Sequence, residues 1–259
     1  MPRFDRLELD GPPPEDDFGG KPAAAADVRD EQHWLKQADR ERRQGHHETA
    51  LRMYSRALED NKAVIAAWVG QVQMLVLLGE YPEAELWARK ALEVFKNHPD
   101  LLAGRAQAFG RLGDKRQAMG ACDQALSQPG ESAYRWVVRG ELMLINKESI
   151  DRHCFDKAAA ADPDWLVQAE IGLLLMHHKQ PAKALPRFRA AIEAEPESPF
   201  LWMKRADCER ALGLADATAE SLRRVLDLAP GHPEAKMALD AQTARRGSLL
   251  GKLLGLFGH

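Results

Sequence analysis

The sequence predicts an all-α fold built from tandem helix pairs, and three observations support that class. Glycines recur 34 residues apart, and so do two columns of alanines, which indicates one structural unit repeated along the chain. The glycines are Gly45, Gly79 and Gly113, and the alanine columns are Ala50, Ala84, Ala118 and Ala57, Ala91, Ala125. Period-two runs of β-branched residues are absent, so no strand is expected.

Each unit is predicted to hold two helices joined by a tight turn. In the second unit, Trp68, Val72 and Leu75 recur at i, i+4 and i+7, which is the spacing of one helix face. The stretch "LLGEYP" then interrupts the pattern, and apolar residues resume between positions 84 and 92. Glycine at the interruption suits a left-handed helix end, and proline stops a second helix. The closing prolines are Pro163, Pro196 and Pro230.

The first helix of most units also repeats a pair of positions that fit close packing. One position holds an aromatic residue, and the position four residues later holds a small one. The aromatic residues are Trp34, Trp68, Trp136 and Trp202, and the small ones are Ala38, Ala106, Gly140, Gly172 and Ala206. We expect the small residue where two helices approach closely, with an aromatic ring filling the space beside it.

The fourth unit departs from this pattern. Its stretch "INKESIDRHCFDKAAAADP", residues 145–163, lacks both the turn glycine and the first alanine. The pattern therefore defines the boundary of its second helix less closely than it defines the others.

These features together resemble the tetratricopeptide repeat, a helix-turn-helix unit of 34 residues. The resemblance implies a right-handed α-solenoid of six repeats that covers about four-fifths of the chain. The six units are 31–64, 65–98, 99–132, 133–164, 165–198 and 199–232. A non-repetitive helical bundle has no reason to hold such a period over 200 residues.

Composition and charge exclude several classes of function. The formal net charge of −3 argues against binding to nucleic acid, which requires a basic excess. Three widely spaced cysteines fit reduced thiols, and no secretory signal or membrane-spanning run is recognisable. We therefore expect a cytoplasmic protein.

No motif for catalysis, metal binding or a cofactor is found in the sequence. C-x-x-C and H-E-x-x-H motifs are absent, and "GGK" at 19–21 lacks the other residues of a phosphate-binding loop. The pairs His46–His47 and His177–His178 fall at or beside turns, where solvated side chains are expected. We predict no enzymatic activity and no bound cofactor.

A binding site is expected on the concave face that the first helices of a solenoid present. Rotation by about 100° per residue from the inward stripe gives a neighbouring stripe that would face this groove. Its members are Val69, Gln73, Val76, Ala103, Gln107, Gly110, Val137, Glu141, Leu144, Ala169, Leu173 and Met176. The end units contribute more polar residues: Leu35, Asp39, Arg42, Met203, Asp207 and Arg210. An apolar middle with charged ends suits an amphipathic helix or an apolar peptide, although the same residues could instead pad a tight superhelix.

One branch of the family binds the terminal carboxylates of chaperone tails with a Lys and an Asn on the first helix. At the corresponding positions this chain has Leu35 and Asp39, Val69 and Gln73, and Ala103 and Gln107. None of these pairs fits, so chaperone-tail binding is not expected.

The segments that flank the repeats differ in character. Residues 1–30 are rich in Pro, Gly, Ala and acidic residues and are expected to be disordered. Within them, "FDRLEL" at 4–9 could be a short docking element or part of a plain acidic leader. Residues 233–246 are predicted to form a capping helix with Met237, Ala241 and Ala244 on one stripe.

The C-terminal tail, 247–259, combines glycines with large apolar residues. It could fold back on the repeats, dock on a partner, or lie on a membrane with basic residues near anionic headgroups. The predicted docking residues are Leu249, Leu250, Leu253, Leu254, Leu256 and Phe257.

Two hypotheses follow for the function. The first is a non-catalytic scaffold or adaptor that binds a partner peptide or helix in its groove. The alternative is a membrane-recruited assembly factor that is anchored through the tail.

Overall fold

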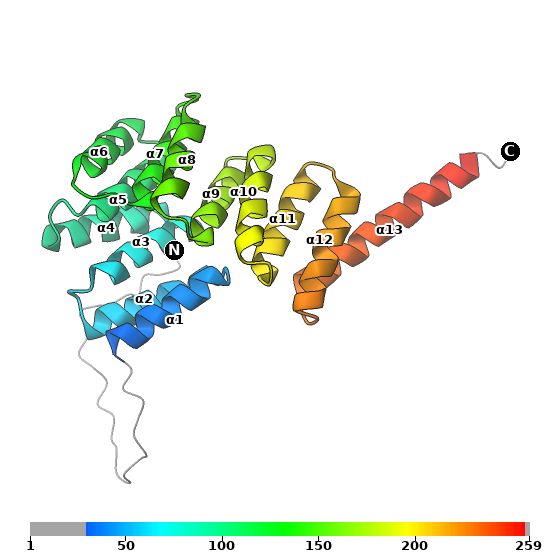
Figure 1. The fold of residues 1–259 in the computed structure, drawn as a ribbon, viewed down its shortest axis with the longest axis horizontal. Helices are drawn as coiled ribbons and strands as arrows, with labels where there is room; N and C mark the ends of the chain where they lie inside the picture. The colour runs from blue at the N-terminus through cyan, green and yellow to red at the C-terminus, as the bar shows by residue number, and fades with distance from the viewer. Residues whose placement is uncertain (1–29, 257–259) are drawn as a thin grey trace, which may run out of the picture. The chain divides into compact units, whose positions relative to one another are not determined.

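The computed structural model describes residues 30–256 of the chain, with the side chains of residues 30–244. Within that part of the chain all regular elements are α-helices, and thirteen of them follow one another in tandem (Figure 1). The predicted all-α fold of helical repeats is confirmed. The chain divides into two compact units, one that ends at Pro129 and one that starts at Gly130.

The first unit contains three helix pairs that begin at residues 31, 65 and 99. Its helices are α1 (Glu31–Arg43), α2 (His47–Asp60), α3 (Ile65–Leu78), α4 (Tyr81–Val94), α5 (Pro99–Leu112) and α6 (Lys115–Ser127). Glycines occupy the turns within the pairs, as the sequence predicts. Gly79 and Gly113 cap α3 and α5 with φ of 86° and 90°, a left-handed conformation that costs glycine little.

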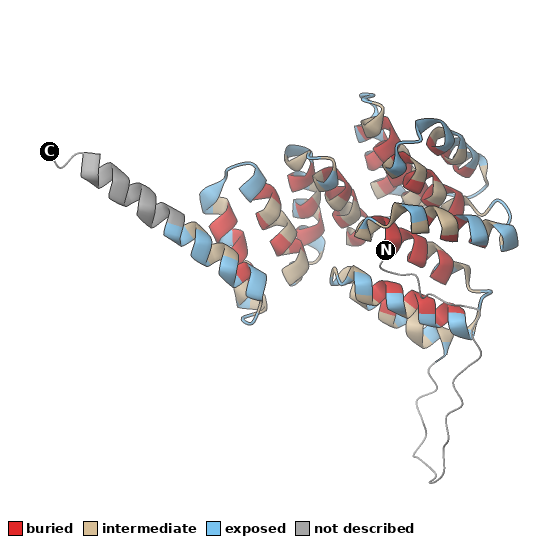
Figure 2. Cartoon of the chain, turned by 180° about the vertical axis from the view of Figure 1, so that it is seen from behind, coloured by how far each residue is buried: buried red, intermediate tan, exposed pale blue. Residues whose placement is uncertain are grey.

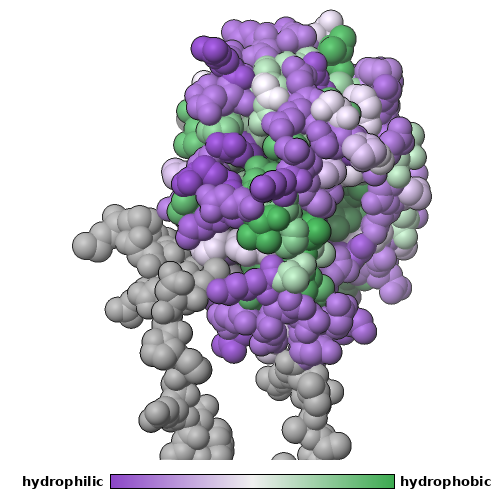
Figure 3. Space-filling view, turned by 90° about the vertical axis from the view of Figure 1, so that its left-hand side faces the viewer, coloured by the Kyte–Doolittle hydropathy of each residue, from purple (hydrophilic) through white to green (hydrophobic). Residues whose placement is uncertain are grey.

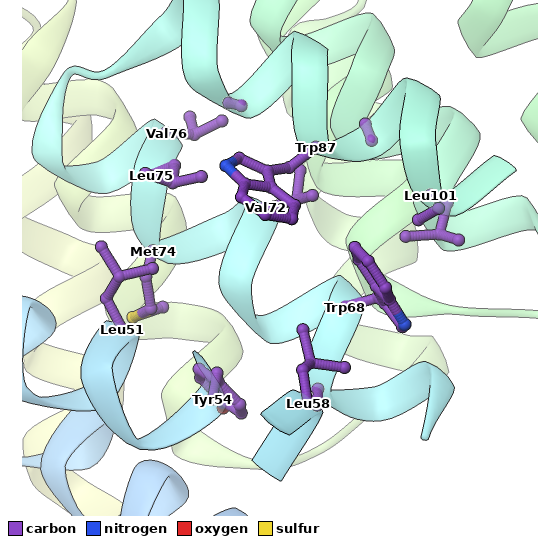
Figure 4. Close-up of a cluster of buried hydrophobic side chains, with 14 of the residues drawn as sticks. Leu51, Tyr54, Leu58, Trp68, Val72, Met74, Leu75, Val76, Trp87 and Leu101 are labelled. Carbon is purple, nitrogen blue, oxygen red and sulfur yellow. The ribbon is translucent and has the colours of Figure 1, made fainter. Parts of the chain in front are cut away.

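The core of this unit lies between the paired helices. Both alanine columns of the sequence are fully buried there. Figure 4 shows Trp68 of α3 and Trp87 of α4 in this core, and their ring centroids are 5.8 Å apart. Buried residues follow the faces where helices meet, and exposed residues follow the turns (Figure 2).

The second unit contains three further pairs and a final helix. Its helices are α7 (Ala133–Ile145), α8 (Asp151–Ala161), α9 (Trp165–His177), α10 (Pro181–Ala194), α11 (Pro199–Ala211), α12 (Ala215–Leu228) and α13 (Pro233–Leu256). In its first two pairs the small residues Gly140 and Gly172 lie where two helices approach closely, as predicted, but the ring against each glycine comes from the second helix of the pair and not from the aromatic position of the first helix. A Cβ added at Gly140 would lie 2.5 Å from the Phe155 ring, and one at Gly172 would lie 2.7 Å from the Phe188 ring.

The irregular fourth pair, α7–α8, folds without its turn glycine because another residue takes the same backbone conformation. Lys147 has φ of 62°, and Lys179 does the same in the next pair with φ of 56°. The first alanine slot of α8 is filled by Asp151, seven residues before Ala158. This carboxylate is 4% exposed, so a charged group lies where other pairs bury a small one.

Helix α13 differs from the predicted cap in two respects. It continues without a break through Gly247, Gly251 and Gly255 to Leu256, although each glycine in a helix costs about 1 kcal/mol. The helix also packs through another face than predicted. Ala235 is fully buried and Leu239 packs beside it, whereas Met237 of the predicted stripe is 72% exposed.

The segments that flank the repeats carry predictions that the structure leaves open. The N-terminal residues 1–29 lie outside the described part of the chain. Of the predicted tail docking residues, Leu249 to Leu256 lie on the backbone of α13 with side chains outside the described set, and Phe257 lies wholly outside it. Among the described residues, no helix combines the length and the apolar character that crossing a bilayer requires.

Candidate peptide-binding surface

The groove residues predicted from the sequence lie on the first helices of the pairs, and we call this set the first-helix stripe. In the first unit it comprises Val69, Gln73 and Val76 on α3, with Ala103 and Gln107 on α5. Val69 is half-buried, whereas the other four are buried. In the first unit the stripe is therefore mostly buried, and only Val69 keeps part of its surface exposed.

Gln73 is the least satisfied member of this part of the stripe. Its side chain is 7% exposed, and the amide oxygen Oε1 has no hydrogen-bond partner in the structure. A buried acceptor without a donor costs about 1–3 kcal/mol. Gln107, at the equivalent place on α5, is also 7% exposed but makes a polar contact.

In the second unit the stripe comprises Val137, Glu141 and Leu144 on α7, and Ala169, Leu173 and Met176 on α9. Val137, Glu141 and Ala169 are buried. The other three side chains, Leu144, Leu173 and Met176, are half-buried and pack against the same hydrophobic core. These apolar side chains are the most accessible part of the stripe in this unit.

A polar pair lies within this part of the stripe. Glu141 is 1% exposed, and its Oε1 lies 2.6 Å from Nε2 of His178 at the end of α9. The expectation that both histidines of the 177–178 pair are solvated is therefore wrong for His178, while His177 is exposed. Little in the sequence signals this contact, because it joins a first helix to the turn of the following pair, 37 residues later.

Sulfur groups link the stripe to the next pair. The Sγ of Cys208 on α11 lies 3.1 Å from the Sδ of Met176 on α9. Burial raises the pKa of the Cys208 thiol to about 12, so this group is a packing residue rather than a thiolate nucleophile at neutral pH. This contact holds the thioether of Met176 in place at the surface of the core.

The polar end of the stripe on α11 carries paired charges. The carboxylate of Asp207 accepts from Lys204 Nζ at 3.4 Å and from Arg210 Nη2 at 2.5 Å. In the first unit, Asp39 of α1 is likewise paired with Arg43 at 2.9 Å. The charged ends expected from the sequence are thus occupied by local ion pairs.

Figure 3 shows one face of the molecule, on which hydrophobic residues form a patch among hydrophilic ones. Apolar patches bordered by polar residues are typical of interaction surfaces. Among the described residues, no group of three or more His, Cys, Asp or Glu side chains is placed to hold a metal ion.

Comparison with known families identifies the repeats. The sequence profile of the tetratricopeptide repeat matches residues 35–101 and 170–233, which together make up just over half of the chain. The chain belongs to the tetratricopeptide repeat family. Members of this family are typically non-catalytic scaffolds for protein–protein interactions.

Solved structures of other tetratricopeptide repeat proteins are similar to this chain at low sequence identity. A thermophilic member from Thermus thermophilus is 16% identical, with 83% of this chain and 99% of that chain covered and a TM-score of 0.49. A member from Parabacteroides merdae is 18% identical, with 84% and 86% covered and a TM-score of 0.48. YrrB, a member with an unusual peptide-binding site, is 18% identical, with 71% and 96% covered and a TM-score of 0.41. A search of curated protein sequences finds no match to this chain.

Proposed function

We propose that this chain is a non-catalytic cytoplasmic adaptor that binds a partner peptide or helix along its first-helix stripe. The observation that carries the proposal is the set of half-buried apolar side chains on α7 and α9. Leu144, Leu173 and Met176 rest on a common core and keep part of their surface exposed. Apolar groups that are ordered before a partner arrives lose little entropy on binding.

The chemistry of the stripe favours an amphipathic helix or an apolar peptide as the ligand. The apolar side chains of α7 and α9 would contact its hydrophobic face, as in helix-in-groove recognition. The ion-paired Asp207 and Arg210 on α11 would contact polar groups at one end.

The cytoplasmic location rests on the state of the cysteines. Cys122, Cys154 and Cys208 are all buried as free thiols, which is the usual state in a reducing compartment. Fractionation of source cells, followed by detection of the chain with an antibody, tests this part of the proposal.

The function is tested by capture from source-organism lysate in mild detergent, with variants of the chain as baits. Leu173→Gln together with Met176→Gln removes the apolar surface at half-buried positions. Leu214→Gln is the matched control, because Leu214 is an apolar residue of the same unit that is 44% exposed in a turn. Circular dichroism and thermal unfolding establish that each bait is folded.

We expect a protein partner that the natural chain and the Leu214 control retain and that the stripe variant loses. A purified partner must then show the same order of affinities in solution. Equal retention by the folded stripe variant and the control contradicts the proposal.

The alternative, membrane recruitment through the tail, is favoured by one feature of α13. The helix continues to Leu256, and its final residues combine leucines with Arg245, Arg246 and Lys252. Sedimentation with phosphatidylcholine vesicles, with and without phosphatidylserine, tests this alternative. It requires anionic vesicles to bind the full chain, and binding to be lost in Leu253→Asp and in a chain that ends at Arg246.

A further inference from the structure

A cavity opens between the second helices of the fourth and fifth pairs, away from the first-helix stripe. It lies between α8 and α10, over side chains of α9, and has a volume of about 550 Å³. We call it the outer cavity. All of its lining residues belong to the second unit, and none of them belongs to the first-helix stripe.

Three cations and two carboxylates line the outer cavity. Asp151 is 4% exposed, and its Oδ2 accepts from Lys183 Nζ at 2.8 Å. Asp156 accepts from Arg187 Nη2 at 2.8 Å and lies 3.7 Å from Nε of Arg152. Both carboxylates are therefore already paired with cations of the same wall, and the third cation gives the wall an excess of positive charge.

The two arginines can donate to a ligand as well as to the wall. Arg187 is 17% exposed and donates to Asp156 and, at 3.3 Å, to Oε1 of Gln168. A guanidinium carries five N–H groups, so these contacts do not use all of its donors. Arg152 is 87% exposed, and most of its guanidinium faces solvent. A carboxylate in the cavity would thus find donors from both helices.

Helix α10 is the most basic of the second helices, which extends the positive charge along one wall. From residue 177 to residue 192 the chain has four lysines and arginines and no Asp or Glu, whereas α2, α4, α6, α8 and α12 each carry an acidic residue before their last turn. The four cations are Lys179, Lys183, Arg187 and Arg189. Because the whole chain has a net charge of −3, this excess is a local property, and it favours the approach of an acidic partner.

The floor of the cavity is apolar, and one wall adds a backbone acceptor. Phe155 of α8 and Leu175 of α9 are 2% and 1% exposed and form the floor. Pro186 lies inside α10 and has no N–H group, so the carbonyl of Ala182 loses the donor that a helix supplies four residues later. Ala182 and Pro186 both line the cavity, and both are exposed. A peptide can donate a backbone N–H group to this carbonyl, which a simple carboxylate cannot.

We propose that the outer cavity is a second docking site, which binds an acidic segment of a partner protein that carries a large apolar side chain next to carboxylates. The apolar side chain lies on the floor of Phe155 and Leu175. The carboxylates accept from Arg152 and Arg187, and a backbone N–H group of the segment donates to the carbonyl of Ala182. A volume of about 550 Å³ is in the range of ligand pockets and suits a short segment rather than a whole helix.

The site does not rest on the proposed adaptor function. The first-helix stripe presents apolar side chains of α7 and α9, whereas the outer cavity presents cations of α8 and α10. The two surfaces therefore select ligands of different chemistry, and the chain can hold one partner at each.

Peptide selection gives the first test. The probe is a library of random dodecapeptides displayed on phage and captured by the immobilised full chain. The library is first depleted on an Ala182→Trp chain, in which an indole fills the cavity from an exposed position without displacing the core. We expect the enriched peptides to carry Asp or Glu next to a large apolar residue.

Fluorescence anisotropy of one enriched peptide, labelled with fluorescein and measured at low salt, gives the affinities. Ala182→Trp should abolish binding, whereas Ala215→Trp, at an exposed residue that begins α12, is the matched control and should not. Arg152→Glu should weaken binding by about fivefold, the upper range for an exposed ion pair. Arg223→Glu makes the same charge change at an exposed site on α12 and should leave binding unchanged. Circular dichroism establishes that each variant is folded.

A charge swap and hydrogen exchange locate the peptide. Replacing an acidic residue of the peptide with lysine should restore affinity for the Arg152→Glu chain. In the natural chain, the bound peptide should slow amide exchange in α8 and α10. Protection confined to other helices overturns the site.

Failure to enrich acidic peptides, equal binding by the natural and Ala182→Trp chains, or equal effects of Arg152→Glu and Arg223→Glu also overturns the proposal. The stripe variant Leu173→Gln, Met176→Gln should bind the peptide normally. Loss of binding in that variant alone assigns the peptide to the first-helix stripe, which overturns the outer cavity and leaves the adaptor function standing.

Discussion

The fourth and fifth helix pairs fold alike although their sequences obey the repeat to different degrees. Both place a phenylalanine of the second helix against a glycine of the first, Phe155 on Gly140 and Phe188 on Gly172. Both also make their turn with a left-handed lysine instead of glycine. They differ at the first alanine slot, where the fifth pair buries Ala184 and the fourth buries Asp151.

This difference indicates which positions of the repeat determine the fold. The contact between glycine and phenylalanine sets how closely two helices approach, so it must be kept. The alanine slot can accept a carboxylate, provided that a neighbouring helix supplies a cation such as Lys183. The fourth pair therefore keeps the architecture while it changes the chemistry of the surface.

The largest expected effect comes from filling the close contact in the fourth pair. Gly140→Ala would place a methyl group 2.5 Å from Cε1 of Phe155, whose ring is 2% exposed and cannot move aside. We expect a loss of about 3 kcal/mol in the free energy of unfolding, measured by urea denaturation. Phe155→Leu added to the Gly140→Ala chain should restore part of the lost free energy of unfolding. A loss in Gly140→Ala no larger than that caused by an alanine substitution at an exposed position would contradict the role of this contact.

The next effect comes from leaving the buried carboxylate of the fourth pair without its cation. Lys183→Met removes the partner of Asp151, and we expect a loss of about 2 kcal/mol, since an unpaired buried charge is costly. Asp151→Ala, which restores the regular residue of the slot, should change stability much less because Lys183 is half-exposed. Equal losses for the two variants, measured by the same denaturation, would contradict this account.

A smaller effect, of opposite sign, is expected at the turns. Lys147 and Lys179 adopt a left-handed backbone that costs L residues about 1 kcal/mol. Lys147→Gly and Lys179→Gly should each raise the free energy of unfolding by about 0.5 kcal/mol, measured as a higher midpoint of thermal unfolding. Gly79→Ala, which imposes the same strain at φ 86°, is the reverse control and should lower the midpoint.

The smallest effect at neutral pH concerns the thiols of the second unit. Burial raises the pKa of Cys154 above its usual value and that of Cys208 to about 12. A thiol whose pKa is higher in the folded chain contributes stability that is complete below the unfolded value near 9 and is lost as pH rises towards the folded value. Unfolding at pH values from about 7.5 to about 10.5 should show the decline, and Cys208→Ala should reduce it. An unchanged decline in that variant would assign it to other groups.

The spacing of small residues predicted the helix pairs because the packing that requires small residues forms between residues that are near in the chain. Ala84 and Ala91 lie in the core of the first unit, and each is fully buried. Gly79 lies at a turn whose backbone needs positive φ. Such requirements recur with every repeat, so one sequence is enough to reveal them.

The candidate site was less predictable. The sequence placed Val76, Ala103 and Ala169 beside the groove, but these residues are buried. How much of a stripe remains accessible depends on how neighbouring pairs pack, which periodicity along one helix does not encode. The pairing of Glu141 with His178 and the cavity beside Asp151 likewise join residues of different pairs.

The sequence by itself determined the helical class, the glycine turns of the first unit and the small residues at Gly140 and Gly172, because each follows from steric demands on residues that are near in the chain. Tertiary structure decided which stripe residues stay exposed, which face of α13 packs, and which cation pairs with Asp151. Those outcomes depend on distances between separate helices, and only the packed chain fixes such distances.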